Sequence, residues 1–454
     1  MKMRKITIPM MLCVLAMLES CGVYTHYERP DMAFVDSLFQ PADTLQSETS
    51  IASLPWRELF TDTLLKRYIE IGLANNTDLK IAHLKVAEAE ATLHAARLAF
   101  LPSATFSASS TMRHGNAPAY SVAPSAELEL DFAGKQRNAK RGAQAALAQS
   151  EAYAQFVQTQ LIATIADSYY MLLMLDEQLK ISRRTLDTWE ENIRALQAWK
   201  RAGKTNEAAV LQAQANKMRV ENSVLTLERQ ILEQESTFAS LLGIAPLQIE
   251  RSALLEPSFP DEMTIGVPLQ LVSHRPDVRQ AEEALSVAFY ATNQARSAFY
   301  PSVTLTGSAG WTDGGGSISN PDNWLLSAIG SLVQPIFARG TLRARLKIAQ
   351  AQQEAALLNF RQSLLDAGTE VNIALVRWQT ARKRLDIDKK QIMSLRAAVW
   401  NTMLLMKHAP NANYLEVLTA QQNLLQAELT ETSDKYDEIQ GVISLYFALG
   451  GGTE

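Results

Sequence analysis

The chain has 454 residues, of which 47% are hydrophobic and 20% are charged, and its formal net charge is −5. With a mean hydropathy of −0.09, this composition is compatible with water and excludes a bundle of membrane-spanning helices. The mild acidity also argues against a surface that binds nucleic acid or another polyanion.

The first 20 residues have the composition of a signal peptide, with a basic start followed by an apolar run from Ile6 to Leu18. This run is too short to span a bilayer. It ends at the segment Leu18–Gly22, which resembles a bacterial lipobox. We therefore expect residues 1–20 to be removed and the thiol of Cys21 to carry a lipid. The alternative is an ordinary signal peptide that is followed by a coincidental cysteine.

Cysteine usage agrees with an exported lipoprotein. Cys13 lies in the segment that would be removed, and Cys21 is the other cysteine of the chain. This count excludes a disulfide, a zinc–cysteine cluster and a catalytic thiol in the mature protein. We expect no cofactor other than the covalent lipid on Cys21, and two or three acyl chains would anchor the protein stably in a membrane.

Ordered structure is predicted to begin near Leu54. Residues 21–53 follow the expected lipid site, are polar and contain Pro30 and Pro41, so we interpret them as an extended tether. A helix is then predicted from Asp62 to Arg97. It must end before Pro102, because proline disfavours a helical conformation in the residue that precedes it.

A β-hairpin is predicted over residues 103–132. The segments 105–111 and 125–132 alternate apolar and polar residues and flank a loop at 113–122. One face of the second segment is apolar, and the other carries Glu127, Glu129 and Asp131. Such carboxylates could indicate acid–base catalysis, but no nucleophile or orienting base accompanies them in the sequence.

Long helices make up most of the chain. Residues 137–201 contain no proline, and a helix of this length is about 95 Å long, too long for a hydrocarbon layer of about 30 Å. After a break at Gly203, a second helix runs towards Leu242. Two segments show the 4–3 spacing of coiled coils: Val220, Val224, Leu227, Ile231, Gln234, Phe238 and Leu241, and Leu415, Leu418, Gln422, Leu425, Leu429, Thr432, Tyr436, Ile439, Ile443 and Tyr446.

The chain contains an internal duplication with a period of about 200 residues. Ala96–Ser103 returns as Ala295–Ser302, and Val210–Gln214 returns as Val417–Gln421; this period is far too long for a solenoid. The two coiled-coil segments fall in different registers of the repeat, which we interpret as helices with neighbours on two sides. The expected domains are a first repeat at 54–250, a linker at 251–271, a second repeat at 272–450 with a hairpin at 302–337, and a tail at 451–454.

The two hairpins have strands of about ten residues, the length that a tilted strand needs to cross a bilayer. Four strands cannot close a barrel, and open edges are not tolerated in lipid. If the hairpins lie in a membrane, the chain must oligomerise, and a trimer with twelve strands is the simplest closure. Glu127, Glu129 and Asp131 would then face the lumen and favour cations; the alternative is a solvated surface near the base of the barrel.

One group of soft side chains could indicate a metal site. Met403, Met406 and His408 lie near the end of a predicted helix, and thioether and imidazole groups suit copper or silver. Methionines at helical spacing are more often packing residues, and we predict no metal site.

Taken together and in order, several segments resemble the lipid-anchored, TolC-like outer-membrane efflux proteins, also called outer membrane factors. The resemblance covers nearly the whole mature chain. The segments that carry it are Trp56 with Phe60 and Asp62, Asn75–Leu79, Phe100–Ser103, Arg275–Val278 with Ala281 and Glu282, Phe299–Ser302, Pro335–Phe337 with Gly340, and Tyr414–Leu418.

The resemblance implies a mainly α-helical fold with a transmembrane β-barrel portion. Three chains would form a twelve-stranded outer-membrane barrel that continues into a periplasmic helical barrel. The implied function is a passive exit duct of a tripartite efflux system, with no enzymatic activity. Its partners would be outer-membrane lipid, a periplasmic adaptor (membrane fusion protein) and an inner-membrane pump of the RND type, and no nucleic acid.

The resemblance also assigns residues at the periplasmic end. The family's adaptor contacts are the two helix-to-helix turns, which correspond here to Gly203, Lys204 and Thr205 and to Pro410, Asn411 and Ala412. The family usually has glycine where Pro410 stands, and proline cannot take positive φ, so the second turn must have another shape. Glu416 matches one of the family's acidic gate positions, whereas Thr419 replaces a nearby aspartate. A solvent-facing role for Glu416 is the alternative.

Two other functions remain open at this stage. The same duct could serve a peptide or protein secretion system, because only the pump would differ. A soluble periplasmic coiled-coil scaffold without a membrane barrel is the rival from another class. The exported compounds, the pump and the resting state of the gate do not follow from the sequence.

Overall fold

A computed structural model describes the ordered parts of the chain, which are residues 25–30, 54–112, 114, 119–246, 248–254, 275–313, 324–408 and 414–452. The expected lipid site Cys21 and the second turn, with Pro410, Asn411 and Ala412, lie outside the described residues. Within these ranges, every helix falls short of the length and hydropathy needed to cross a membrane.

The chain forms two compact units, each built from parts of both repeats. The first unit contains the described parts of Met1–Met32, His83–Tyr153 and Asp277–Ser363. The second contains those of Ala33–Ala82, Ala154–Pro276 and Leu364–Glu454.

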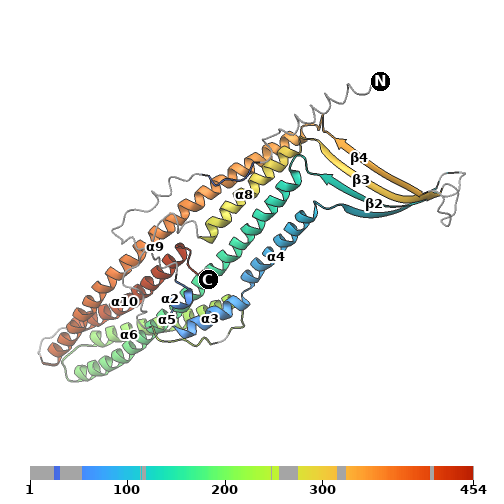
Figure 1. Ribbon diagram of the computed structural model, residues 1–454. Helices are drawn as coiled ribbons and strands as arrows, with labels where there is room; N and C mark the ends of the chain where they lie inside the picture. Colours follow the sequence, from blue (N-terminus) through green and yellow to red (C-terminus); the bar gives the residue numbers. More distant parts are fainter. Residues whose placement is uncertain are drawn as a thin grey trace, which may run out of the picture. The chain divides into compact units, whose positions relative to one another are not determined.

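The sheet lies in the first unit and has the order β1-β2-β3-β4, with antiparallel pairs throughout. Its strands are β1 (Ser103–Thr111), β2 (Ala119–Leu130), β3 (Ser302–Asp313) and β4 (Trp324–Val333), and Figure 1 shows them side by side. The sequence predicted the second hairpin at 302–337, a range that contains β3 and β4. It placed β2 at 125–132, whereas β2 begins at Ala119, inside the predicted loop, and ends before Asp131 because that side chain binds the start of the next helix.

The helices of the first unit pack on one another, and the strands lead away from their ends (Figure 1). They include α8 (Pro276–Ser297) together with parts of α4 (Thr77–Leu98), α5 (Lys135–Arg201) and α9 (Thr341–His408). The hydroxyl of Thr292 on α8 donates to the Ala349 carbonyl on α9, at 3.2 Å. Tyr290 on α8 lies against Gly142 on α5, so α8 is held between the two long helices.

The second unit contains two helical hairpins (Figure 1). The first joins α5 to α6 (Glu207–Leu241), and the second joins α9 to α10 (Tyr414–Ala448). The bounds of α5 and α6 are close to those predicted. Five of the predicted α6 seam residues are buried, namely Val220, Val224, Leu227, Ile231 and Phe238. The predicted α10 seam is wrong at its first residue, because Leu415 is 58% exposed, whereas the next predicted residue, Leu418, is buried together with Tyr414 and Val417.

The helix predicted from Asp62 to Arg97 is divided in two, α3 (Thr63–Asn75) and α4. Asn76 causes the break, because its side chain accepts from the Leu79 amide at 3.0 Å and donates to the Leu241 carbonyl of α6 at 2.9 Å. Asp62 caps α3 by accepting from the amides of Leu64 and Leu65.

A large aromatic core lies beside this break. It includes α2 (Trp56–Leu59) and joins parts of α3, α5, α6, α9 and α10. Its largest fully buried side chains are Trp56, Phe60, Tyr169 and Phe238. The close contact of α10 with α9 depends on Gly441, since a Cβ there would lie 2.9 Å from the Cα of Trp378.

Candidate functional site

The strand register separates the sheet into an apolar face and a polar face. On the apolar face, Leu128 lies opposite Leu305, and Leu130 lies opposite Val303, which in turn lies opposite Leu332. Phe106 and Leu326 belong to the same face and are 72% and 88% exposed. An exposed apolar sheet face is the arrangement that strands need against lipid.

The polar face is lined with hydroxyl groups. Thr105, Ser125, Ser308 and Ser327 form a row across all four strands. The Thr105 and Ser125 hydroxyls are 2.8 Å apart, and those of Ser308 and Ser327 are 2.6 Å apart. This row is wettable, as a water-filled channel requires.

Two of the three acidic residues singled out in β2 lie on this polar face. Glu127 pairs with Thr306, and Glu129 pairs with Thr304. The Lys135 ammonium donates to the Glu129 carboxylate at 2.9 Å, whereas the exposed Glu127 carboxylate has no ion-pair partner among the described residues. The charge of Glu129 is therefore partly compensated.

Asp131 differs from these two residues. Its carboxylate accepts from the backbone amides of Gln136 and Arg137 at 3.0 and 2.9 Å, and its side chain is only 8% exposed. A carboxylate at this place complements the positive end of α5. The Asp131 carboxylate therefore lies at the start of α5 and not beside those of Glu127 and Glu129, because β2 ends at Leu130.

The first helix-to-helix turn has the geometry that its glycine requires. Gly203 takes φ +71°, which glycine adopts without steric cost. The Lys204 amide donates to the Trp199 carbonyl at 2.9 Å and closes the end of α5. Asn206 caps α6 by accepting from Ala209 at 3.0 Å. Gly203 and Lys204 are exposed, and Thr205 is half-buried, so this tip presents its polar groups outward.

Of the second tip, the structure describes the start of α10. Glu416 is exposed in the first turn of that helix. Exposure in one chain agrees both with a gate residue and with a solvent-facing residue.

Between the two hairpins lies a ladder of polar contacts that sequence reasoning missed. Asn192 on α5 donates to Gln421 on α10 at 2.9 Å, with both side chains buried. Glu428, one heptad further along α10, accepts from Arg184 on α5 at 2.6 Å and from Arg396 on α9 at 2.9 Å. The seven-residue spacing of Gln421 and Glu428 was the available signal, since polar residues at a coil seam set its register.

A cavity of about 290 Å³ lies beside this ladder, lined in part by Arg184, Trp189, Arg396, Met403 and Gln421. Met406 packs instead on the apolar cluster that contains Trp189 and Leu418, as expected of a packing methionine. Among the described residues, no three His, Cys, Asp or Glu side chains form a group that could hold a metal.

Comparisons with known proteins agree with this arrangement. The family model for the outer membrane efflux protein matches twice, at residues 69–244 and 267–451. The chain is 26% identical to the cation efflux system protein CusC of Escherichia coli K12, covering 97% of this chain and 98% of that protein. It is 27% identical to the pyoverdine export outer membrane protein OpmQ of Pseudomonas putida, covering 98% of each.

A solved structure shares the fold. The open state of the Neisseria gonorrhoeae MtrE outer membrane channel superposes with a TM-score of 0.86 at 26% identity, covering 95% of this chain and 98% of that one. The expected fold class, helices with four strands per chain that contribute to an outer-membrane barrel, is confirmed. The chain therefore belongs to the outer membrane efflux protein family and is the outer-membrane channel component of an efflux system.

Proposed function

We propose that three copies of this chain form a passive exit duct, anchored by a lipid on Cys21 and joined through a periplasmic adaptor to an RND-type inner-membrane pump. The duct would need no cofactor and would have no enzymatic activity of its own. The observation that carries the proposal is the open sheet: β1 and β4 are edge strands, and one face is apolar and exposed. In lipid, such edges must be paired.

Pairing β4 of one copy with β1 of the next closes the sheet, and three copies of four strands give a barrel of twelve. An even number of antiparallel strands is typical of such barrels. The hydroxyl row and Glu127 would then line the lumen, and the apolar face would contact lipid.

A second surface supports self-association. The α6 helix carries an exposed apolar stripe at strict seven-residue spacing: Leu211, Met218, Leu225 and Leu232, which are 55–64% exposed. The seam that packs on α5 is a different set of residues, so α6 has an unpartnered face. Repeats of seven in apolar residues are the pattern of a coiled-coil contact.

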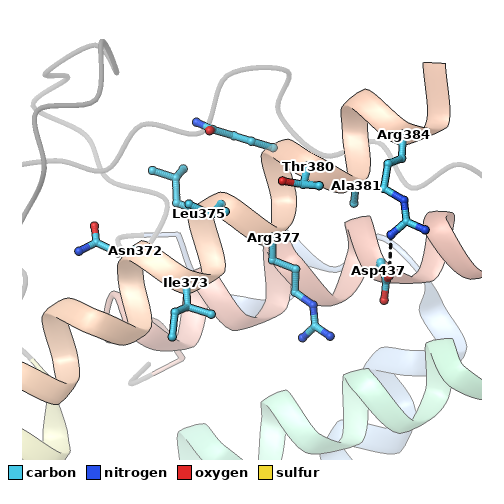
Figure 2. A pocket seen from close by; sticks show the side chains of 10 residues that line it. Asn372, Ile373, Leu375, Arg377, Thr380, Ala381, Arg384 and Asp437 are labelled. Carbon is cyan, nitrogen blue, oxygen red and sulfur yellow. Dashed lines mark ion pairs between the residues drawn. The ribbon is translucent and has the colours of Figure 1, made fainter. Parts of the chain in front are cut away.

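The complementary surface lies on α9. A groove of about 780 Å³ is lined by α9 residues together with Asp437 of α10 (Figure 2), and Ile373 and Val376 in it are 62% and 61% exposed. Residues 372–396 of α9 have seven basic and two acidic side chains, whereas α6 has five acidic and three basic ones. The opposite charges favour α6 of a second copy as the occupant of this groove.

The tips are the proposed contacts with the adaptor. Gly203, Lys204 and Thr205 form a turn in which Gly203 and Lys204 are exposed, and Pro410, Asn411 and Ala412 would form the second one. Glu416, at the start of α10, is the proposed gate residue: three copies around a three-fold axis would repel one another unless protonated or bridged by cations. Relatives are named for cations and for pyoverdine, which supports a duct whose cargo is chosen by the pump.

The subunit count and the α6–α9 contact can be tested together. Native mass spectrometry of the detergent-solubilised lipoprotein should give three copies. The double variant Leu225→Lys, Leu232→Lys should lower the temperature at which the trimer dissociates, and Gln230→Lys, on another face of α6, is the matched control. A single copy for the wild-type protein would contradict the duct, and an unchanged dissociation temperature for the double variant would contradict the α6–α9 contact alone.

A further inference from the structure

A pair of buried carboxyl groups joins the two helices of the second hairpin. Asp388 on α9 is 7% exposed, Asp434 on α10 is 1% exposed, and the two side chains are within hydrogen-bonding reach of each other. Each lies 20 residues from the tip end of its helix, at His408 and Tyr414, which corresponds to about 30 Å. Neither residue belongs to the tip, the gate position or the polar face of the sheet.

Three of the four carboxylate oxygens of Asp388 and Asp434 lack a hydrogen-bond donor among the described residues. Neither oxygen of Asp434 nor Oδ2 of Asp388 accepts a hydrogen bond from a described group. Arg384 is the nearby cation: its Nη2 lies 2.7 Å from Asp434 Oδ1, and its Nη1 lies 3.9 Å from Asp437 Oδ2, the latter contact being drawn in Figure 2. One guanidinium, 51% exposed, thus serves the carboxyl groups of both Asp434 and Asp437, while Asp388 lies against Asp434. Two ionised carboxylates that share a buried site are unfavourable.

The other helices do not supply the missing positive charge. On residues 176–184 of α5, each charged residue is already paired: Asp176 with Arg251, Glu177 with Lys180, Arg183 with Glu228, and Arg184 with Glu428. Asp167 of α5 is a further acid, and it accepts from the Tyr436 hydroxyl at 2.9 Å. On α10 itself, Lys435 pairs with Glu431. Apolar side chains of α5 and α6 pack on the neighbouring Tyr436. The group best placed to satisfy the orphaned oxygens is therefore a proton between the two acids.

We propose that Asp388 and Asp434 share one proton, and that loss of this proton loosens α9 from α10, so that the hairpin carrying the second tip responds to pH. The sharing of a proton does not depend on the proposed function. Its effect on the channel rests on that function. Periplasmic pH would thereby bias the conformation of the periplasmic end.

Burial, together with Asp388, raises the pKa of Asp434 to about 6, although Arg384 opposes the shift. The pKa in the folded protein lies above the ordinary value of 3.8. Between pH 3.8 and about 6, the folded state therefore binds more protons than the unfolded state. The contribution to stability is fully present below about pH 4 and is lost as the pH rises through 6.

The first test is the melting temperature of the solubilised protein between pH 4.5 and 8. Asn is isosteric with protonated Asp and can donate to the remaining carboxylate, so Asp434→Asn should melt higher than the wild-type protein at pH 7.5, by about 2–5 °C, and should flatten the pH profile. Asp388→Asn should do the same. Asp386→Asn, an exposed position on α9, is the matched control.

A lower melting temperature for Asp434→Asn at pH 7.5 with an unchanged pH profile would overturn the shared proton. So would flattening of the profile by Asp386→Asn. If 1 mM Ca²⁺ stabilises the wild-type protein at pH 7.5 but not Asp434→Asn, the pair binds a divalent cation and the proton is excluded.

The second test is conductance in planar bilayers. Wild-type channels should conduct more at pH 7.5 than at pH 5.5, whereas Asp434→Asn should show no difference. If the melting profiles follow expectation but no conductance is found at any pH, the shared proton stands and the proposed duct fails. If conductance is found but varies with pH equally in both proteins, the coupling to the channel is overturned.

Discussion

Arg184 on α5 donates a hydrogen bond of 2.6 Å to Glu428 on α10, and this contact joins residues 244 positions apart, one from each repeat of the duplicated chain. A second hydrogen bond, from Arg396 on α9, reaches the same carboxylate at 2.9 Å. Glu428 is 6% exposed, while both arginine side chains are more than half exposed. One buried acid therefore links three helices, with its two cations at the solvent boundary.

Removing this carboxylate should loosen the contact between the two hairpins. Glu428→Ala eliminates two charge-assisted hydrogen bonds, but water can solvate the exposed guanidinium groups, so we expect a loss of about 1–3 kcal/mol in the free energy of unfolding. Glu191→Ala, at an exposed position of α5, should leave the melting temperature unchanged. Equal melting temperatures for the wild-type protein and Glu428→Ala would show that the link adds nothing to stability.

Asp62 should give a pH dependence of the opposite sign from that of Asp434. Burial alone would raise the pKa of Asp62, but hydrogen bonds from Ser252, Tyr169 and the amides of Leu65 and Leu64 outweigh it and lower the pKa below 3.8. A lowered pKa contributes stability above the ordinary value, and this contribution is lost as the pH falls through the folded-state value.

The variant Asp62→Ala should therefore be less stable than the wild-type protein at pH 7. The loss of the α3 cap and of the bond from the Tyr169 hydroxyl, which is 2.9 Å long, should cost about 2–3 kcal/mol. The difference in melting temperature should shrink as the pH is lowered towards 3, and Asp187→Ala, an exposed control on α5, should show no such trend. A difference that stays constant with pH would mean that the carboxylate charge is not involved.

Two glycines in long helices should respond to alanine with opposite signs. At Gly441, the new Cβ would lie 2.9 Å from the backbone of Trp378, so α10 would have to move away from α9, at a cost of about 1–3 kcal/mol. At Gly142, the new Cβ would be 3.5 Å from Tyr290, an ordinary contact, and alanine should stabilise the helix by about 0.5–1 kcal/mol. Thermal unfolding of both variants measures this contrast, and a stabilised Gly441→Ala would contradict the close packing of α9 and α10.

Residues 25–30 of the tether should fix it to α8. The Tyr27 ring packs edge-on against Phe289 of α8, with centroids 5.8 Å apart, and Arg29 pairs with Glu282 of the same helix at 3.3 Å. Tyr27→Ala should therefore make the tether more sensitive to limited proteolysis, whereas Glu28→Ala, at an exposed position, should not. Identical cleavage rates for the two variants would show that the aromatic contact does not fix the tether.

The elements that the sequence predicted well are those set by local patterns. The absence of proline indicated α5, coiled-coil spacing indicated α6, and alternation of apolar and polar residues on each side of a loop indicated the hairpin of β1 and β2. The two faces of β2 also followed, because residues two apart in a strand share a face; the register that pairs Leu128 with Leu305 of β3 was not predicted.

The parts that could not be predicted depend on contacts between distant residues. Asn76 divides a helical pattern because its side-chain amide donates to the Leu241 carbonyl of another helix. The residues around Asn76 in the sequence carry no pattern that indicates this contact. Asp131 has the spacing of a strand residue, but the start of α5 captures its carboxylate. The acid pair of Asp388 and Asp434 was invisible for the same reason: 46 residues separate two side chains that meet only when α9 folds back on α10.

The separation of Glu127 from its two acidic neighbours leads to a graded prediction for ion selectivity. If the polar face lines the lumen, Glu127→Gln should reduce cation preference most, because its carboxylate has no ion-pair partner among the described residues. Glu129→Gln should have a smaller effect, since removing that acid also releases Lys135 from its pair. Asp131→Asn should leave the reversal potential unchanged and instead lower the melting temperature, because it weakens the binding of the α5 start. Reversal potentials in a salt gradient across a planar bilayer measure the order, and a dominant effect of Asp131→Asn would place that carboxylate in the pore after all.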